Sequence, residues 1–334
     1  MNGREEADAK IFNKLECETK WDLPSYVREW YLHLRANHCT AITCQDYLRK
    51  VRDYLYSVRP YEIEEIPRES ITAESVESYL LGKQYKYDKD GNVVKTSNSY
   101  QSSIYFCMNN FLEFMAKRKY IPCNYIKEYD IKNTKNKDKV ERIHLTKDDF
   151  HKIIEKSMEN SDFDAGKARE AAILLLLMIT GMRRGALCSI NLSDFEIEDN
   201  KIVGKTLSVT DKGEKTHDYI LTRQTIKALN NWLEHREFYA DNITTDALFI
   251  NHSGTRLSNK MVGDIVKQAC YNGIGKELSP HKLRAGFITI MIEETGDIMA
   301  TCEAVGHASV RTTQRYYATN GRGKKMAADI MKDL

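Results

Sequence analysis

The longest largely apolar run in the chain, residues 171–180, is the feature that most constrains its fold. A helix that crosses a bilayer needs roughly 20 apolar residues, and this run has about half of that. Residues 171–178 are apolar on every face of a helix, and such a helix is stable only where other elements surround it. We therefore expect a globular domain built around a buried central helix.

The length of the chain indicates a second domain. Single hydrophobic cores stop growing at roughly 250 residues, and this chain has 334. Apolar residues make up 42% and charged residues 29%, which is too apolar for a largely disordered protein. The N-terminus has no apolar signal core and the eight cysteines form no CxxC pair. We expect a cytoplasmic protein with no membrane span, zinc ribbon or disulfide framework.

The first half of the chain is expected to be helical. Apolar residues at helical spacing predict two helices within residues 21–58, a third behind a capping sequence at Thr72, and a fourth over residues 102–119. A hairpin or loop turned at Asp90-Gly91 separates the last two. This half shows no nucleophile with a base, metal cluster or phosphate loop, so we expect it to bind rather than catalyse.

The second half mixes helices with a small sheet. Thr146 is expected to cap the helix that opens this half. Alternating β-branched residues over 194–221, with turns at 199–200 and 212–213, predict a short antiparallel sheet, after which helices resume. The expected fold class is mainly α with a small antiparallel β-sheet in the second domain.

A basic stretch between the two halves predicts the domain boundary. Residues 117–139 hold eight basic and three acidic residues, a local charge of +5 (8 − 3), whereas the whole chain carries only +2. Such a stretch suits contact with nucleic-acid phosphates, and a solvated linker has the same composition. We place the linker here and start the second domain near Arg142.

Four motifs in the second half hold the residues that can carry chemistry. They are T-G-M-R-R around Arg183, D-K-G-E-K around Lys212, H-K-L-R at 281–284 and G-H-A-S-V-R-T-T-Q-R-Y-Y at 306–317. Taken singly, each has an ordinary structural explanation as a surface arginine, a turn or a structural histidine. Their order and spacing are what indicate a function.

In order and spacing, these motifs resemble the catalytic domain of the tyrosine recombinase (phage integrase) family. That family shows an arginine after T-G, a hairpin lysine, H-x-x-R, then G-H and a tyrosine nine residues later. The corresponding residues here are Arg183, Lys212, His281, Arg284, His307 and Tyr316. The resemblance covers residues 142–320 by motif, and the helical first half looks like the family's core DNA-binding domain. It implies a two-domain clamp on DNA.

The patterns and the resemblance together give the expected domain organisation. It comprises an N-terminal extension (1–20), a helical core DNA-binding domain (21–119), a basic linker (120–141), a tyrosine recombinase catalytic domain (142–317) and a C-terminal oligomerisation helix (318–334). The last segment has apolar residues at helical spacing, which indicates an unfinished face. Exchange between neighbours in a DNA-bound tetramer, as the resemblance implies, and docking on the chain's own domain both fit.

The resemblance implies that Tyr316 is the nucleophile and that Arg183 and Arg284 stabilise the transition state. Attack on a phosphodiester adds negative charge to its non-bridging oxygens, and guanidiniums, always charged and able to donate two hydrogen bonds, suit that task. The 3′-phosphotyrosyl product stores the bond energy, so neither a cofactor nor a metal is expected.

The resemblance assigns proton transfer to the remaining residues. His281 assists with the tyrosine proton, Lys212 protonates the leaving 5′-oxygen, and His307 hydrogen-bonds the phosphate. Tyr317 competes with Tyr316, but the nine-residue step from His307 favours Tyr316. Lys215 competes with Lys212, and the glycine that follows Lys212 favours the latter.

One position departs from the family pattern. Three residues after Arg183, where the family often has an acidic residue, this chain has Ala186. That carboxylate generally supports the arginine, so we expect altered support rather than the loss of a catalytic group.

The expected function is site-specific recombination for integration and excision of a mobile element. Resolution of chromosome or plasmid dimers, or DNA inversion, would use the same chemistry. A type IB topoisomerase and a catalytically inactive DNA-binding paralogue are the alternatives from other classes. The expected partners are double-stranded DNA, a homotetramer on paired sites and accessory DNA-bending proteins, with no membrane.

Overall fold

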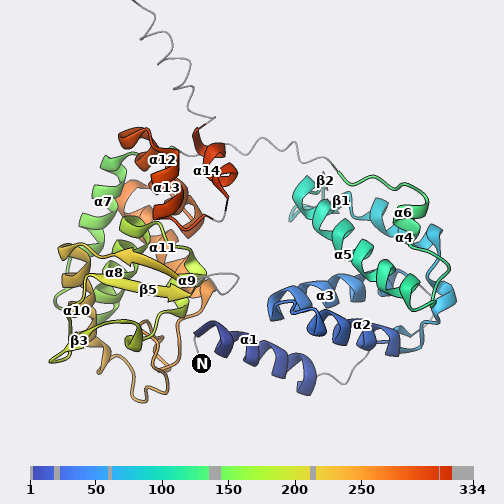
Figure 1. Cartoon of the computed structure of the whole chain (residues 1–334), viewed down its shortest axis with the longest axis horizontal. Helices are drawn as coiled ribbons and strands as arrows, with labels where there is room; N and C mark the ends of the chain where they lie inside the picture. Colours follow the sequence, from blue (N-terminus) through green and yellow to red (C-terminus); the bar gives the residue numbers. More distant parts are fainter. Residues whose placement is uncertain are drawn as a thin grey trace, which may run out of the picture. The chain divides into compact units, whose positions relative to one another are not determined.

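The computed structural model describes residues 3–18, 23–58, 62–134, 144–210, 216–307 and 309–317 (Figure 1). For residues 3–7, 17, 18, 64, 210 and 315–317 only the backbone is described. Contacts within the chain divide it into two compact units, Glu5–Glu141 and Arg142–Leu334 together with Met1–Arg4, and each has its own hydrophobic core. No helix among the described residues is long and apolar enough to span a membrane.

The first unit consists of helices and one hairpin in its described residues. Its α-helices are α1 (Gly3–Asn13), α2 (Ser25–Ala36), α3 (Ala41–Ser57), α4 (Ala73–Gly82), α5 (Asn98–Lys117) and α6 (Tyr125–Glu128). A π-helix lies at Lys14–Glu18, and 3₁₀ turns lie at Ile63–Glu65 and Arg68–Ser70. Strands β1 (Tyr85–Tyr87) and β2 (Val93–Lys95) pair antiparallel. The hairpin at Asp90-Gly91 is therefore confirmed.

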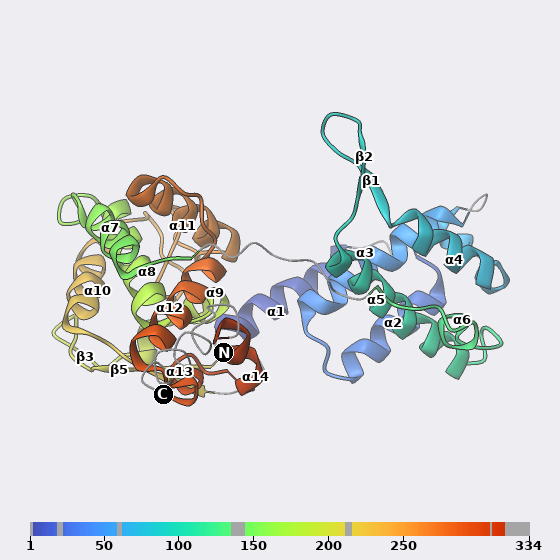
Figure 2. The same ribbon diagram turned by 90° about the horizontal axis from the view of Figure 1, so that it is seen from above.

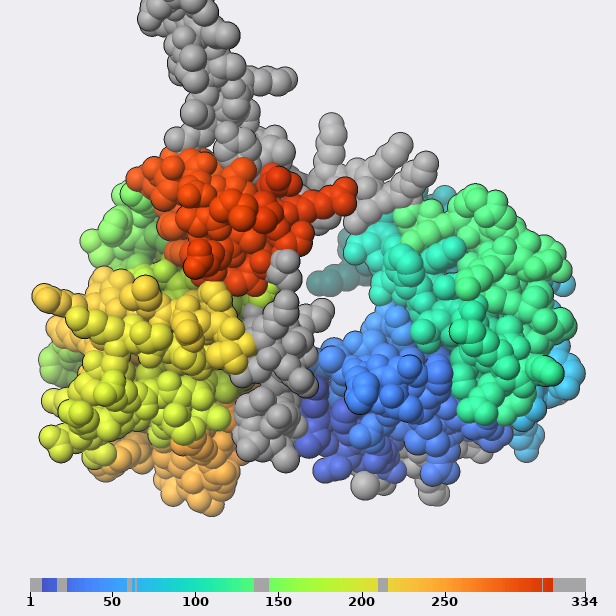
Figure 3. All heavy atoms as spheres, in the orientation of Figure 1, coloured from blue at the N-terminus to red at the C-terminus, as the bar shows by residue number. Residues whose placement is uncertain are grey.

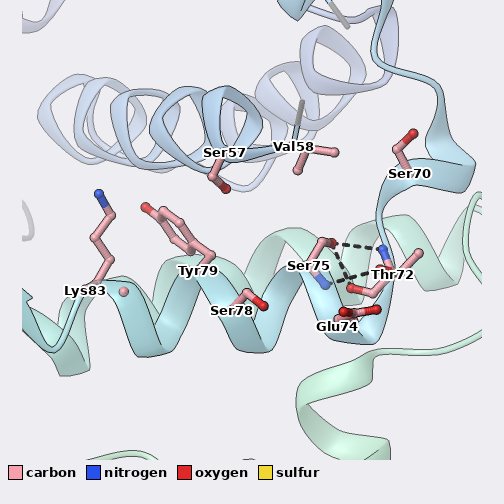
Figure 4. A pocket seen from close by; sticks show the side chains of 10 residues that line it. Ser57, Val58, Ser70, Thr72, Glu74, Ser75, Ser78, Tyr79 and Lys83 are labelled. Carbon is pink, nitrogen blue, oxygen red and sulfur yellow. Dashed lines mark hydrogen bonds between the residues drawn. The ribbon is translucent and has the colours of Figure 1, made fainter. Parts of the chain in front are cut away.

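Local capping explains where two of these helices begin. At α4, the Ser75 N–H donates to the Thr72 hydroxyl (3.2 Å) and the Thr72 N–H donates to Ser75 Oγ (3.0 Å), a reciprocal capping box (Figure 4). The predicted cap at Thr72 is thus confirmed. Helix α5 begins at Asn98, earlier than the expected residue 102, because the Ser97 hydroxyl accepts from the Tyr100 N–H and caps it there.

Aromatic side chains fill the core of the first unit. Trp30 is fully buried, with its ring stacked on Tyr47 at 6.0 Å and edge-on to Phe111 at 5.1 Å. Its indole N–H donates to Asn110 Oδ1 at 2.9 Å, so the one polar atom of the ring is satisfied. Burial of a large apolar side chain of this kind stabilises the folded state by about 1.5–3 kcal/mol.

The core of the first unit includes residues beyond 119, the residue at which the sequence predicts the end of this domain. Ile121 and Ile126 are buried in its core, and the Tyr105 hydroxyl donates to the Ile131 carbonyl at 3.0 Å. Within the basic stretch, Lys127 forms an ion pair with Glu113 at 2.7 Å. Residues 135–141, the rest of the expected linker, lie outside the described residues.

The second unit mixes helices with two small sheets. Its helices are α7 (Lys147–Met158), α8 (Ala165–Thr180), α9 (Arg184–Ser189), α10 (Arg223–Arg236), α11 (Asn259–Ile274), α12 (Pro280–Thr295), α13 (Ile298–Ala304) and α14 (Val310–Tyr317), with a 3₁₀ turn at Leu192–Asp194. Strands β3 (Ile197–Glu198) and β4 (Lys201–Ile202) form one antiparallel pair, and β5 (Thr206–Thr210) and β6 (Thr216–Ile220) form another. The expected fold class, mainly α with small antiparallel sheets, is confirmed.

Helix α8 is the buried central helix that its sequence predicts. Residues 171–178 are each at most 2% exposed, and α7, α10, α11 and α12 pack around them (Figure 1). The predicted cap at Thr146 is also present, since its hydroxyl accepts from the Asp149 N–H at 3.1 Å. Because α8 is held on several sides, the residues just beyond its C-terminus have a fixed position.

Helices α12, α13 and α14 pack against one another. Figure 3 shows them as one continuous surface of the second unit, in orange and red. The short loop at residues 305–307, between α13 and α14, is held against α12 by a hydrogen bond from Arg284 to the Val305 carbonyl. The end of α8, the start of α12 and this loop together build the candidate site.

Candidate active site

The C-terminus of α8 sets the position of Arg183. Gly181 ends the helix with φ of +61°, a conformation that residues with a Cβ rarely adopt, and its N–H donates to the Leu177 carbonyl at 3.1 Å. The Met182 N–H then donates to Thr180 Oγ1 at 3.2 Å. Arg183 follows as the N-cap residue of α9 and is half-buried.

Helix α12 carries the H-K-L-R motif in its first two turns. Pro280 begins the helix, where its missing N–H costs nothing. His281 and Arg284 are three residues apart and therefore share one face. Arg284 is only 5% exposed, and its Nη1 donates to the Gly181 carbonyl (2.5 Å) and its Nη2 to the Val305 carbonyl (2.8 Å). This guanidinium joins the end of α8 to the loop before α14.

Arg183 reaches the same loop. Its Nη1 donates to the Gly306 carbonyl at 3.5 Å, and Gly306 has φ of +62°. The two guanidiniums therefore meet at consecutive backbone carbonyls, immediately before His307.

His307 is half-buried, and a hydrogen bond to α14, the helix that follows the loop, holds its ring. Its Nδ1 lies 2.8 Å from the hydroxyl of Thr313, a fully buried residue of α14. Desolvation lowers the pKa of His307 to about 4, and the charges of Arg284 and Arg183 act in the same direction. The ring is therefore neutral at pH 7. When Nδ1 accepts from Thr313, the ring proton sits on Nε2, which is then a hydrogen-bond donor.

The pKa of His281 is also lowered. Partial desolvation is the largest cause even though the side chain is exposed, and the charge of Arg184 comes next. Arg284 and Arg183 contribute further lowering. Arg184, to which the sequence assigns no role, thus lies within electrostatic reach of His281.

The structure does not describe the side chains of the remaining two predicted catalytic residues, Lys212 and Tyr316. Lys212 falls within residues 211–215, between the paired ends of β5 and β6, and lies outside the described residues. Tyr316 and Tyr317 belong to the last turn of α14, and their side chains lie outside what is described. The structure brings together the other four, which are Arg183, His281, Arg284 and His307.

The position of Ala186 is apolar. Ala186 is 2% exposed and belongs to the hydrophobic core of the second unit. Hydrogen bonds to backbone carbonyls orient the two arginines here, at Gly306 for Arg183 and at Gly181 and Val305 for Arg284. Whether the absence of a carboxylate at position 186 alters the support of Arg183 stays a prediction.

His217 is a site neighbour that the sequence does not single out. It stands on β6, and its Nε2 lies 3.2 Å from the Ala304 carbonyl. A Cβ added at Gly306 would come within 3.2 Å of its ring, so the imidazole packs directly on the loop. No sequence pattern indicates this contact, because its partners are 87 residues away.

Arg256 supports the site from behind α9. Its Nη1 donates to the carbonyls of Cys188 (3.1 Å) and Ile190 (3.2 Å), and its Nη2 donates to Asn191 Oδ1 (2.6 Å). These bonds satisfy carbonyls at the C-terminal end of a very short helix. They fix the helix that Arg183 caps.

The arrangement suits a phosphate-like anion. Two guanidiniums keep their charge at any physiological pH and can each offer two donors. Two imidazoles beside them have lowered pKa values, because desolvation first and nearby positive charge second disfavour protonation. An anion that enters would offset the part of this lowering that the arginine charges cause.

Comparison with known proteins agrees with the motifs. Residues 144–322 match the model of the phage integrase family. The chain belongs to the phage integrase family. Among its relatives, a protein named tyrosine recombinase XerC from Alcanivorax borkumensis is 36% identical over 149 residues, which cover 44% of this chain and 47% of the relative. The match thus spans about half the length of that relative.

Two solved structures resemble both units of this family member. XerH site-specific recombinase bound to palindromic difH substrate, in a post-cleavage complex, gives a TM-score of 0.60 at 20% identity and covers 89% of this chain and 82% of that chain. A lambda integrase tetramer bound to a Holliday junction gives 0.57 at 17% identity, with 87% and 76% covered. The chain shares the fold of these proteins.

Proposed function

We propose that the chain is a site-specific DNA recombinase that cleaves and rejoins strands through a 3′-phosphotyrosyl intermediate on Tyr316. The observation that carries this proposal is the convergence of Arg183 and Arg284 on the carbonyls of residues 305–306, directly beside His307. A scissile phosphate bound there would meet two guanidiniums and an imidazole N–H. These are the donors that attack on a phosphodiester requires.

In this proposal the arginines stabilise the charge that develops on the non-bridging oxygens. Arg284 is buried and oriented by two carbonyls, so its guanidinium needs little reorganisation when the phosphate binds. His307 would donate from Nε2 to the same phosphate. Losing one such oriented donor typically costs about 10²–10³ in rate.

Proton transfer would accompany the exchange of bonds. The bond from phosphorus to Tyr316 forms as the bond to the 5′-oxygen breaks. His281 would take the phenolic proton, since its lowered pKa keeps it neutral at pH 7 and able to accept. Lys212 would protonate the departing 5′-oxygen. The reverse reaction, attack by a 5′-hydroxyl, would release Tyr316 and seal the strand without an external energy source.

For the biological role we propose the resolution of chromosome dimers. The sequence alone favours integration and excision of a mobile element, with resolution as the alternative. The likeness to a relative named XerC supports the alternative. The likeness to lambda integrase concerns the fold alone and does not favour integration.

We propose double-stranded DNA as the substrate and a homotetramer on two paired sites as the active assembly. Two proteins of the same fold support this assignment: XerH, solved bound to its difH substrate, and lambda integrase, solved as a tetramer bound to a Holliday junction. Residues 318–334, which lie outside the described residues, are the segment we propose for exchange between neighbouring protomers.

Resolution can be tested on a plasmid with two directly repeated copies of the target site. The site is first selected from random duplexes by binding to the protein. Wild type should yield two smaller circles, each with one site, and Tyr316→Phe should yield none. Relaxation of plasmids that lack the site would indicate a type IB topoisomerase. Binding with no change in any plasmid would indicate an inactive DNA-binding paralogue.

A further inference from the structure

The β1–β2 hairpin of the first unit has no part in the proposed chemistry. It lies between α4 and α5 in the chain, and Figure 2 shows it projecting away from the helices of its unit. Tyr85 is 55% exposed, Tyr87 75% and Val93 63%. A two-stranded ribbon with both faces in water is marginally stable at best, so some other feature must keep it ordered.

The base of the hairpin is fixed to the unit by buried polar groups. Thr96 is 6% exposed, and its hydroxyl donates to the Lys83 carbonyl at 2.7 Å while its N–H donates to the Gln84 carbonyl at 2.9 Å. Gln101, 8% exposed, donates from Nε2 to the Thr96 carbonyl at 3.1 Å. The ribbon therefore leaves the unit in a defined direction.

Hydrogen bonds also fix the tip of the hairpin. The Asp88 carboxylate accepts from the backbone N–H groups of Asp90 (2.9 Å) and Asn92 (2.8 Å). Gly91, with φ of +82°, allows the chain to reverse there. With both ends fixed, the exposed side chains are displayed on a preformed ribbon and not on a loose loop.

The exposed side chains combine aromatic rings with lysines, and residues 85–95, with three lysines and two aspartates, carry a net charge of +1 (3 − 2). The register pairs Tyr85 with Lys95 and Tyr87 with Val93, so these four side chains share one face. Lys86 stands on the other face and Lys89 near the tip. Within the part of the chain that the structure describes, Lys86, Lys89 and Lys95 are exposed and form no ion pair.

We propose that this ribbon is a DNA-contacting element of the first unit and lies in the major groove of the bound duplex. The inference rests on the proposed function, which supplies the duplex. The major groove, about 12 Å wide, admits a two-stranded ribbon. Tyrosine hydroxyls hydrogen-bond to phosphates and base edges, and each lysine near a phosphate releases a condensed counterion. A protein partner fits less well, because stable interfaces use roughly 20–30 residues a side.

The test compares three variants of the full chain on the selected duplex. The first variant replaces Lys86, Lys89 and Lys95 by alanine. The second variant replaces Tyr85 and Tyr87 by alanine. The control replaces Lys152, Lys156 and Lys267, exposed lysines of the second unit that are each paired with a carboxylate, and so removes the same net charge. Kd is measured between 50 and 200 mM salt, with covalent adduct at saturating protein as a second readout.

Three lysines that neutralise phosphates contribute about 2.7 to the slope of log K against log salt. Over a fourfold change in salt, wild type should therefore lose about 40-fold more affinity than the ribbon-lysine variant. The tyrosine variant should bind at least about fivefold more weakly with an unchanged salt slope, since it removes no charge. The control should match wild type.

The outcomes separate the two proposals. Equal Kd and equal salt slope for wild type and both ribbon variants would overturn the ribbon inference alone, provided that wild type forms the adduct. If the ribbon variants bind DNA normally but assemble paired sites less well, the ribbon inference is also overturned. That result would indicate that the ribbon contacts another copy of the chain. If wild type binds no duplex, the proposed function itself fails.

Discussion

The imidazole of His307 and the hydroxyl of Thr313 lie 2.8 Å apart, and their hydrogen bond joins the loop before α14 to α14 itself. Thr313 has no exposed surface, so water cannot replace its hydroxyl at Nδ1. Helix α14 also includes Tyr316. The bond therefore couples the orientation of the proposed phosphate ligand to the helix of the proposed nucleophile.

Replacement of Thr313 by valine should slow strand cleavage about tenfold while DNA affinity stays near wild type. Valine fills the same volume and leaves Nδ1 without its partner, so the ring no longer has a fixed tautomer. Thr313→Ser, which restores the hydroxyl, should recover most of the rate. Single-turnover cleavage and Kd are measured for the three proteins; equal rates for Thr313→Val and wild type would contradict the role.

Replacement of Arg183 by lysine should cost about 10²–10³ in cleavage rate although the charge is kept. An ammonium group cannot reproduce the planar pair of donors that a guanidinium offers to a phosphate. Because Arg183 is half-buried and its side chain makes no capping hydrogen bond to α9, the melting temperature should change little. Single-turnover cleavage at saturating protein measures the effect, and a rate within threefold of wild type would exclude Arg183 from the transition state.

Replacement of Gly181 by alanine should destabilise the second unit and disturb the site. The added Cβ would lie 2.4 Å from the Phe287 ring, and φ of +61° is itself costly for alanine. The Gly181 carbonyl also accepts from Arg284. The expected loss is about 2–4 kcal/mol in the free energy of unfolding, combining strain and clash.

Gly296 supplies the matched control for this experiment. It ends α12 with φ of +69°, and nothing lies within 4 Å of an added Cβ. Gly296→Ala should therefore cost only the backbone strain, about 1–2 kcal/mol. Urea unfolding of both variants measures the difference. Equal losses would mean that the Phe287 contact yields without cost.

The lowered pKa of His307 predicts a pH dependence of stability. Its pKa is about 4 in the folded protein, below the value of 6.5 for an unperturbed histidine, so the unfolded chain binds the proton more tightly. Folding stability should therefore fall as pH drops from 6.5 towards 4, and this contribution should be complete above 6.5. His307→Gln should lose this part of the dependence. The melting temperatures of the two proteins are compared across that range; parallel curves would contradict the assignment.

Much of the scaffold could be predicted from the sequence because its signals are local. The apolar run at 171–178 predicts a buried helix, and α8 is one. Thr72 and Thr146 predict helix starts because the capping partner is three residues away. The end of the first unit was harder to predict, since the lysine-rich composition around residue 120 hides Ile121 and Ile126, which reach the core.

In the candidate site too, local sequence predicts some features, whereas others depend on how distant segments pack. The spacing of H-K-L-R predicts that His281 and Arg284 share a face, because both lie on one helix. The contact of His217 with the Ala304 carbonyl depends on how β6 packs against the loop, and no pattern within either segment encodes it. Arg256 is missed for the same reason, since its acceptors on and after α9 are 65 or more residues away.

Trapping the covalent intermediate tests whether Tyr316 attacks DNA. Wild type, Tyr316→Phe and Tyr317→Phe are incubated with a nicked suicide duplex that carries the selected site, and the products are separated by denaturing electrophoresis. We expect a protein–DNA adduct for wild type and Tyr317→Phe and none for Tyr316→Phe. An adduct that persists in Tyr316→Phe, or no adduct from wild type bound to the same duplex, would contradict it.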